Sequence, residues 1–537
     1  MKKCNGAYLS LRPDVRYVRG PARSALYDLK SKRIWPLDAW MTRLIGDALK
    51  GRPLAHVVRD LGVRSSRSRQ FVIRALSDHP LLVLSPQPQE NEKPRPASIV
   101  RLPILQDAPL AVQPPSRKEL DFLWLELTER CNLRCVHCYA GSGPGLEDGP
   151  MRTGEHLRIL REAARAGCRK VQFTGGEALL DPDLPGLIDE ARALGYRWIE
   201  VYSNATLLNE SRVRFLRERA VHVAVSFYSH CEETHEAITQ VPGSFRRTVE
   251  AIRSLITAGV AVRAGIIRMR MNQEDVEPAK DLLASLGVDR ATIGVDEVRP
   301  TGRGCGDSLV PAGGQTRMTS PPSGQSMQAG ANGSMGCQTC WSGKIAVAPT
   351  GDVFPCIFSR ELGVGNVLRR PLQEVLETAS LQDLWSIDKE QIPVCRDCEF
   401  RYGCFDCRAL AYKQTGQLRS KPPSCAYDPY TGTWEGAPEP DTSPAAVDGC
   451  IPVRGESLSW VRCGELGLLY SRAHSALLAV NRVATEIVGQ CNGRRSLDRI
   501  ARNLARRYRA PEPDVRRDVR QLLAELAGLG LMELRSA

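Results

Sequence analysis

The stretch Cys131-Asn-Leu-Arg-Cys135-Val-His-Cys138 places three cysteines within eight residues. It follows the strand-like run Phe122-Leu-Trp-Leu-Glu-Leu127, and no fourth cysteine lies nearby. Four thiolates would complete a tetrahedral metal site, whereas three can hold three irons of a cubane iron–sulfur cluster and leave the fourth iron open. An open iron can bind a substrate or a cofactor. The spacing therefore predicts a reaction centre rather than a structural metal site.

Size and charge limit the classes of function that fit this chain. Its 537 residues, of which 42% are hydrophobic, suffice for several packed domains. The net charge of +12 comes largely from arginine, but the arginines are dispersed and only 6% of the residues are aromatic. Base stacking needs basic and aromatic residues side by side. The charge therefore favours an acidic peptide or a mixed partner, or simply a solvated surface, over nucleic acid.

The N-terminus and the cysteine content predict a cytoplasmic protein without a membrane partner. Met1-Lys-Lys-Cys-Asn-Gly lacks the apolar core of a signal peptide, and no apolar run approaches the roughly 20 residues that span a bilayer. Eighteen cysteines in a cytoplasmic chain indicate metal ligation or redox chemistry rather than disulfides.

Composition divides the chain into seven segments. We expect a hairpin with helices at the N-terminus, alternating strands and helices after it, then a cysteine-dense region, and a diverged copy of the first unit at the C-terminus. The predicted boundaries are 1–85 for the first unit, 86–118 for a linker, 119–305 for the strands and helices, 306–336 for a flexible insert, 337–430 for the cysteine-dense region, 431–454 for a second linker and 455–537 for the last unit.

Six strand-like segments alternate with amphipathic helical stretches in the segment 119–305. Repeated βα units of this kind form an α/β parallel sheet or barrel. Polar groups follow three of these strands, at the edge where βα folds place their active sites. They are Gly175, Gly176 and Glu177 after the second strand, Ser203 and Asn204 after the third, and Ser226 near the end of the fourth. The expected strands are Phe122–Leu127, Lys170–Phe173, Trp198–Tyr202, His222–Phe227, Val260–Ile267 and Thr292–Val295.

Taken together, the C-x3-C-x2-C spacing, the Gly-Gly-Glu turn and the six units resemble the radical S-adenosylmethionine (SAM) enzymes. The resemblance implies a partial (β/α)6 barrel and a [4Fe–4S] cluster on Cys131, Cys135 and Cys138, whose open iron binds SAM. It implies that Gly175, Gly176 and Glu177 receive the SAM amino group, that Ser203, Asn204 and Ser226 contact its ribose and carboxylate, and that His137 lies against its adenine. The implied chemistry is hydrogen abstraction by a 5′-deoxyadenosyl radical, with an external one-electron donor of the flavodoxin or ferredoxin type.

Eight further cysteines resemble the SPASM extension of this family, which holds two auxiliary [4Fe–4S] clusters. By that resemblance one cluster uses Cys337, Cys340, Cys356 and Cys407, and the other uses Cys395, Cys398, Cys404 and Cys425, which gives three clusters in all. The chain departs from the family in two ways: only two residues separate Cys404 from Cys407, and Cys337 is the least fixed ligand. Two structural Cys4 zinc sites are the chemical alternative. Ile357 stands where sulfatase-maturating relatives tend to have an acidic base, which argues against formylglycine formation.

The last unit, with Leu469-Tyr470 and Asn481 before its helices, resembles the PqqD-like domains that bind leader peptides of ribosomally made peptides. In that family the leader adds a strand to a sheet edge. A winged-helix DNA-binding fold is the alternative, because Arg494–Arg509 is rich in arginine.

The sequence therefore predicts a radical SAM/SPASM maturase that abstracts hydrogen from a precursor peptide and then forms a C–C, C–S or C–O cross-link. One alternative is a SPASM dehydrogenase, an activase or a radical SAM enzyme for a small molecule, which would act without a leader. Another is a nucleic-acid-binding regulator with structural metal clusters, which would not cleave SAM.

Overall fold

The computed structural model describes residues 7–31, 33–88, 119–312, 338–404, 406–435, 449–455, 458–463, 466–471, 476–528 and 531–535. Most of the two predicted linkers (86–118 and 431–454) and of the predicted insert (306–336) lies outside these residues, as does Cys337. No helix within the described ranges is long and apolar enough to cross a membrane.

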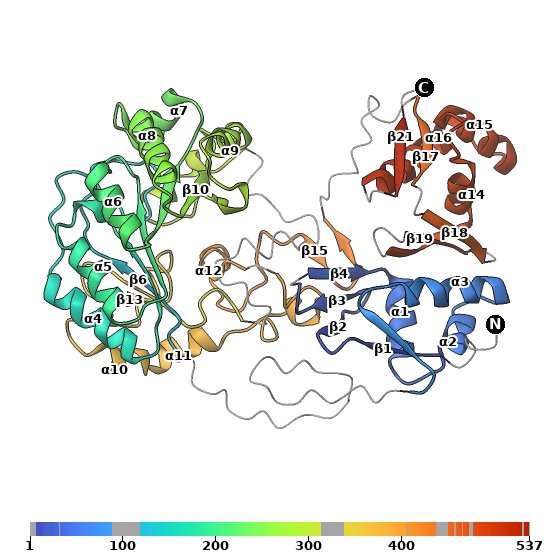
Figure 1. Cartoon of the computed structure of the whole chain (residues 1–537), viewed down its shortest axis with the longest axis horizontal. Helices are drawn as coiled ribbons and strands as arrows, with labels where there is room; N and C mark the ends of the chain where they lie inside the picture. Colours follow the sequence, from blue (N-terminus) through green and yellow to red (C-terminus); the bar gives the residue numbers. More distant parts are fainter. Residues whose placement is uncertain are drawn as a thin grey trace.

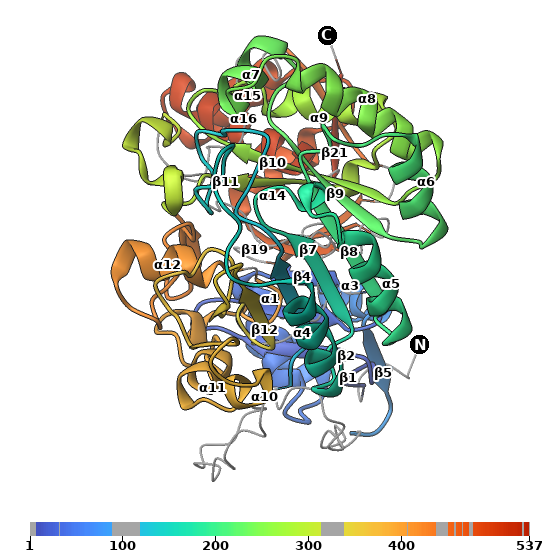
Figure 2. The same ribbon diagram turned by 90° about the vertical axis from the view of Figure 1, so that its left-hand side faces the viewer.

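A curved sheet of nine strands forms the barrel, which lies at the left-hand end of the protein in Figure 1 and faces the viewer in Figure 2. Its order is β11-β10-β9-β8-β7-β6-β12-β13-β14, and β6 to β11 are parallel neighbours in sequence order. These six strands confirm the predicted partial (β/α)6 barrel. Their bounds are β6 Phe122–Glu126, β7 Lys170–Thr174, β8 Trp198–Ser203, β9 His222–Phe227, β10 Val262–Arg268 and β11 Ile293–Glu297.

Helices cover the convex side of this sheet. Alternate residues of the strands, such as Val171 and Phe173 of β7, are fully buried in one core with Ile159 and Leu160 of α4. The residues between them, such as Gln172, face the concave side. The helices are α4 Thr153–Arg165, α5 Leu184–Ala193, α6 Glu210–Glu218, α7 Glu232–Thr239, α8 Ser244–Thr257 and α9 Val276–Ser285. In Figure 1, α4, α5 and α6 lie on the side of the barrel away from the two terminal units, and α7, α8 and α9 lie along its top.

The first half of the cysteine-dense region is part of the barrel rather than a separate body. β12 pairs in parallel with β6, and β13 and β14 continue the sheet in antiparallel fashion. Trp341 and Trp385 are buried in the same core as the barrel strands. The elements of this region are β12 Lys344–Val347, β13 Asp352–Phe354, β14 Gly365–Asn366, α10 Leu372–Leu376, α11 Ala379–Ser386, α12 Arg408–Thr415, β15 Tyr427–Asp428 and β16 Thr433–Trp434.

The two terminal units have the same order of elements. In each, a three-stranded antiparallel sheet precedes three helices, and a short strand before the sheet pairs with one after the last helix. The N-terminal module consists of β1 Tyr8–Leu11, β2 Val15–Arg19, β3 Ser24–Asp28, β4 Arg33–Leu37, α1 Ala39–Ala48, α2 Leu54–Asp60, α3 Ser66–Ser77 and β5 Leu82–Ser85. The C-terminal module consists of β17 Ile451–Arg454, β18 Leu458–Cys463, β19 Leu466–Ser471, β20 Ala476–Asn481, α14 Arg482–Gln490, α15 Leu497–Tyr508, α16 Glu512–Gly528 and β21 Met532–Arg535.

Local chemistry explains why both modules fold alike. Asp38 and Asn481 each accept a hydrogen bond from a backbone N–H in the first turn of the helix that follows, which fixes where α1 and α14 begin. The Leu54 N–H donates to the Ala7 carbonyl, and the Leu497 N–H donates to the Cys450 carbonyl in the same place.

The N-terminal module lies between the cysteine-dense region and the C-terminal module (Figure 1). Tyr27 of β3 packs with Phe400, Tyr402 and Tyr427, and its hydroxyl donates to the Glu399 carbonyl at 2.6 Å. On its other side, helices of this module share a core with Leu468, Tyr470 and Leu477 of the C-terminal sheet. The N-terminal module therefore contacts both the cysteine-dense region and the C-terminal module.

Candidate active site

The three cysteines of the opening motif lie in the loop that leaves the carboxyl end of β6. Arg134 and Val136 donate backbone hydrogen bonds to the carbonyls of Thr239 and Ile238, which fastens the loop to α7. Burial and, after it, the nearby charges of Cys131 and Cys138 raise the pKa of Cys135, so the structure brings the three cysteines together.

Hydrogen-bond donors point at the cysteine sulfurs, as expected of a loop that binds an iron–sulfur cluster. The Leu133 N–H donates to Cys131 Sγ at 3.4 Å, the Asn204 amide donates to the same sulfur at 3.9 Å, and the Tyr228 hydroxyl lies 3.9 Å from Cys135 Sγ. Such bonds stabilise thiolate ligands and tune a cluster. Burial raises the pKa of Cys131 and of Cys135 to about 12, so iron has to displace their protons when it binds.

Gly175 and Gly176 hold the end of β7 against the start of the cysteine loop. The Gly176 N–H donates to the Thr128 carbonyl at 2.7 Å, and the Glu177 N–H donates to the Arg130 carbonyl at 2.9 Å. Gly175 has a φ of +129°, which side chains rarely allow, and a Cβ on Gly176 would collide with the Arg130 carbonyl. Both positions therefore require glycine.

Glu177 joins two strand ends in one network of hydrogen bonds. Its buried carboxylate accepts from the Ser203 hydroxyl at 2.7 Å and from the Asn204 N–H at 2.8 Å, and burial raises its pKa. The Asn204 amide in turn donates to the Asn132 side chain at 2.9 Å, inside the cysteine motif. The predicted SAM residues are thus brought together. Their contacts with SAM stay a prediction, because Glu177 is already engaged within the protein.

His137 and Ser226 both contact Tyr228. The His137 ring meets the Tyr228 ring edge-on at 4.9 Å, and burial lowers the pKa of His137 to about 4, which keeps it neutral. The Ser226 hydroxyl interacts with the phenols of Tyr202 and Tyr228. A neutral ring is suited to packing against an adenine base, which also stays a prediction.

An ion pair that was not predicted from the sequence closes the concave side of the barrel. Glu126 of β6 is buried, and Arg360, four residues after Cys356, donates to both of its oxygens at 2.6 Å. Tyr139, next to Cys138, donates to the same carboxylate at 3.1 Å. Glu126 is the single acidic residue in an otherwise apolar strand, and this pattern could have indicated a buried ion pair. The pair ties the first cysteine loop to the auxiliary region.

A second pair lies deeper in the barrel. Arg263 of β10 donates to Glu200 of β8 at 2.7 and 2.8 Å, and Gln172 of β7 also donates to Glu200. The concave side is therefore polar and charged, as a site that binds a polar substrate requires.

The described cysteines of the auxiliary region gather in two groups. Burial and the nearby charges of Cys407 and Cys356 raise the pKa of Cys340. The Arg408 N–H donates to Cys340 Sγ at 3.3 Å. Arg299, from the end of β11, interacts with Cys407 and packs on Phe358.

The second group surrounds one small cavity, lined by Cys395, Cys398, Cys404 and Cys425. The Phe400 N–H donates to Cys398 Sγ at 3.4 Å. Among the described residues, no three His, Cys, Asp or Glu side chains converge closely enough to hold a single metal ion. A cubane binds each thiolate at a different iron, so its ligands need not meet at one point. The grouping matches the predicted ligand sets, which remain predictions.

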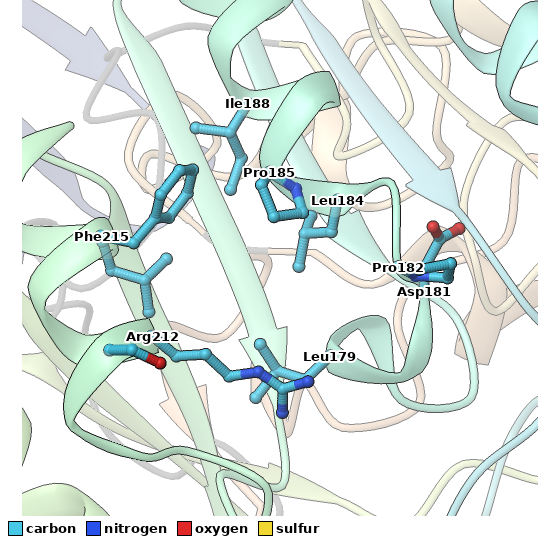
Figure 3. A pocket seen from close by; sticks show the side chains of 10 residues that line it. Leu179, Asp181, Pro182, Leu184, Pro185, Ile188, Arg212 and Phe215 are labelled. Atoms are coloured by element: carbon cyan, nitrogen blue, oxygen red, sulfur yellow. The ribbon is translucent and has the colours of Figure 1, made fainter.

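A further cavity of about 290 Å³ lies between α5 and α6 (Figure 3). Leu184, Ile188 and Phe215 line its apolar part, and Arg212 crosses its opening. Because it is on the helical side of the sheet, away from the cysteine loop, we assign it no role in catalysis.

Models of three protein families match this chain. The radical SAM superfamily matches residues 125–283, the SPASM iron–sulfur cluster-binding domain matches residues 337–399, and coenzyme PQQ synthesis protein D (PqqD) matches residues 467–532. The chain therefore contains a radical SAM domain, and it is an enzyme. Its SAM and iron–sulfur chemistry follows from the first two domains.

Several curated proteins resemble this chain. The AdoMet-dependent heme synthase of Methanosarcina barkeri is 29% identical over 57% of this chain and 95% of its own length. The PqqA peptide cyclase of Streptomyces rochei is 27% identical over 57% of this chain and 89% of its own length. Among solved structures, SuiB of Streptococcus suis bound to S-adenosylmethionine has a TM-score of 0.44 and 14% identity, over 78% of this chain and 99% of that one.

Proposed function

We propose that this radical SAM enzyme modifies a ribosomally made precursor peptide. The observation that carries the proposal is the PqqD domain at residues 467–532, on the same chain as the radical SAM and SPASM domains. The relatives include both a heme synthase and PqqA peptide cyclases, so the barrel alone does not select the substrate class. A peptide-recognition domain has no evident use for a small substrate, which favours the peptide.

The residues of the barrel suit this chemistry. When bound, the cluster and SAM supply a 5′-deoxyadenosyl radical that can take a hydrogen from an unactivated carbon. Cys131, Cys135 and Cys138 would hold the irons, and the network around Glu177 would fix the neighbouring strand ends on which SAM rests. The polar concave side, with the pairs of Glu126 and Glu200, would orient the peptide and exclude water.

We further propose two auxiliary [4Fe–4S] clusters, which would accept the electron left on the peptide as a C–C, C–S or C–O cross-link forms. Cys340, Cys356 and Cys407 with Cys337 would hold one, and Cys395, Cys398, Cys404 and Cys425 would hold the other. Both groups have a backbone N–H directed at one sulfur, which suits thiolate ligands. A flavodoxin or ferredoxin would supply the first electron, in the reducing cytoplasm.

The double substitution Cys395→Ala/Cys398→Ala tests the auxiliary assignment. We expect the variant to lose about four irons per chain and all cross-linked product, but to keep SAM cleavage, because the first cluster stays intact. Iron analysis and chromatography of 5′-deoxyadenosine measure both. Cys231→Ala, outside every ligand set, should keep the full iron content. Unchanged iron in the double variant would contradict the assignment.

Co-expression with candidate precursor peptides, followed by mass spectrometry, tests the function itself. A loss of two hydrogens per modification supports cross-linking. An unchanged mass with deuterium uptake at a Cα would mean epimerisation and would overturn the cross-link. Equal turnover of a leaderless peptide would favour the alternative of an enzyme that needs no leader.

A further inference from the structure

Three arginines of the C-terminal module converge on one carboxylate. Arg462 of β18, Arg482 of α14 and Arg507 of α15 approach Glu486 at 3.5, 3.7 and 3.4 Å. The arginine side chains are 43%, 41% and 59% exposed, whereas that of Glu486 is 9% exposed. We call these four residues the arginine patch. The buried carboxylate of Glu486 thus holds the three guanidinium groups near one another, while the arginine side chains stay exposed to solvent.

Two arginines of the patch, Arg462 and Arg507, carry more positive charge than the acid they share neutralises. Both guanidinium groups approach the single carboxylate of Glu486, so these three residues together carry a net positive charge. Neither oxygen of Glu486 accepts a hydrogen bond from the described residues, which means that the arginines lie at ion-pair distance without aiming their N–H groups at it. Guanidinium forks of this kind bind external carboxylates in pairs of hydrogen bonds.

Exposed apolar side chains accompany the arginines along the chain. Trp460 precedes Arg462 by two residues, Val483 follows Arg482, and Tyr508 follows Arg507. All three belong to the few large apolar residues that are exposed in the described part of the protein. A ligand that combines acidic and apolar groups matches this surface better than a row of phosphates does.

The N-terminal module provides an internal comparison. Tyr17 of β2 lies against Gly46 of α1 as Trp460 of β18 lies against Gly489 of α14. Ala25 pairs with Pro36 as Leu468 pairs with Ala479. Each residue of the N-terminal sheet and of α1 therefore has a matching position in the C-terminal sheet and in α14.

This correspondence shows that the patch is specific to the C-terminal module. The fifth residue of α1 is Arg43, where α14 has Glu486, and the first is Ala39, where α14 has Arg482. The N-terminal module thus lacks the acid that would gather its basic side chains. Pro36 of β4 has no backbone N–H, whereas the N–H of Ala479 at the matching position of β20 donates to Asp38 of the N-terminal module. Its Tyr27 is already packed on the cysteine-dense region.

We propose that the arginine patch binds an acidic segment of the precursor's leader, and that the N-terminal module serves as the platform that fixes the C-terminal module in place. The inference rests on the proposed function and names the chemistry of its peptide partner. Carboxylates of the leader would pair with the exposed guanidinium groups, and its apolar residues would pack beside Trp460 and Tyr508.

Binding of a short synthetic peptide to the full-length holoenzyme tests the patch. The probe is a fluorescein-labelled peptide of repeating Glu-Leu-Glu-Tyr, compared with the same peptide carrying Lys for Glu and with a duplex DNA of matched charge. We expect the acidic peptide to bind, with affinity that falls as salt rises. The double substitution Arg462→Glu/Arg507→Glu should weaken it about tenfold or more.

The matched control is Arg43→Glu/Arg64→Glu, which makes the same change of charge at exposed positions of the N-terminal module. It should bind the probe as the parent does, and circular dichroism should show both variants folded. Equal weakening in the two variants, or tighter binding of the DNA than of the acidic peptide, would overturn the patch. If a precursor is modified equally well with and without Arg462 and Arg507, the patch fails while the proposed function stands.

Discussion

Cys138→Ala is expected to abolish SAM cleavage and to remove about four irons per chain. Two thiolates in this loop cannot hold a cubane cluster against competing water and thiols, because each of the three closed irons needs its own protein ligand. The described neighbours of Cys138 cannot replace the thiolate: Tyr139 donates to Glu126, and Arg303 on the other side of the loop is a cation. Anaerobic iron analysis and assay of 5′-deoxyadenosine would measure the loss, which should reach the background of enzyme-free SAM.

Cys305→Ala is the matched control for this substitution. Cys305 is exposed, lies close to the same loop through its neighbours Arg303 and Gly304, and belongs to no predicted ligand set. Its removal should change neither the iron content nor SAM cleavage. Retention of 5′-deoxyadenosine formation by the Cys138→Ala variant would show that the motif is not the reaction centre.

The barrel could be predicted from sequence because its strands are apolar, rich in β-branched residues and bounded by turns. The predicted start of β10 is two residues early, at Val260 instead of Val262. Gly259 has a φ of +75°, and the chain is still leaving α8 there, so apolar character continues before the extended backbone begins. Local pattern finds a strand more reliably than it finds the strand's first residue.

Strand pairings between segments that are distant in the chain could not be predicted from the sequence. A hairpin was expected in each terminal unit, but the structure has three-stranded sheets and an additional outer pair, in which Tyr8 meets Ser85 and Ile451 meets Arg535. The sequence places a boundary at residue 337, and β12 of the cysteine-dense region extends the barrel sheet beside β6. Four-residue strands take their position from the neighbour they pair with, which no local pattern encodes.

The candidate site shows the same division. The cysteines and the Gly-Gly-Glu turn could be predicted because their spacing within a short stretch of sequence is typical of cluster and cofactor binding. Their partners could not be predicted: Arg360 of the auxiliary region donates to Glu126, and Asn204 at the end of another strand donates to Asn132. Such contacts appear only when the strand ends meet at one edge of the sheet.

Gly176→Ala is expected to disable the site without touching a metal ligand. A Cβ at this position would meet the backbone carbonyl of Arg130, one residue before Cys131, and a carbonyl cannot swing aside as a flexible side chain can. The Gly176–Thr128 and Glu177–Arg130 hydrogen bonds would have to lengthen together. Overpacking of this kind costs about 1–3 kcal/mol of stability. A displacement of about 1 Å at the reacting centre can lower turnover about 100-fold. SAM cleavage and thermal unfolding would measure the two effects.

Gly186→Ala separates this steric effect from a general cost of replacing glycine. Gly186 lies near the start of α5, where an added Cβ would meet no described atom within 4 Å, and alanine favours the helix by about 0.5–1 kcal/mol. The control should therefore unfold at the same or a slightly higher temperature and cleave SAM at the parent rate. Because the cysteine loop rests on the backbone of Gly176, the Gly176→Ala variant should lose SAM cleavage even at temperatures where thermal unfolding shows that it is still folded. Equal activity would mean that the loop adjusts to the added methyl group, and that the close packing of β7 against Thr128–Arg130 is not what positions the cluster ligands.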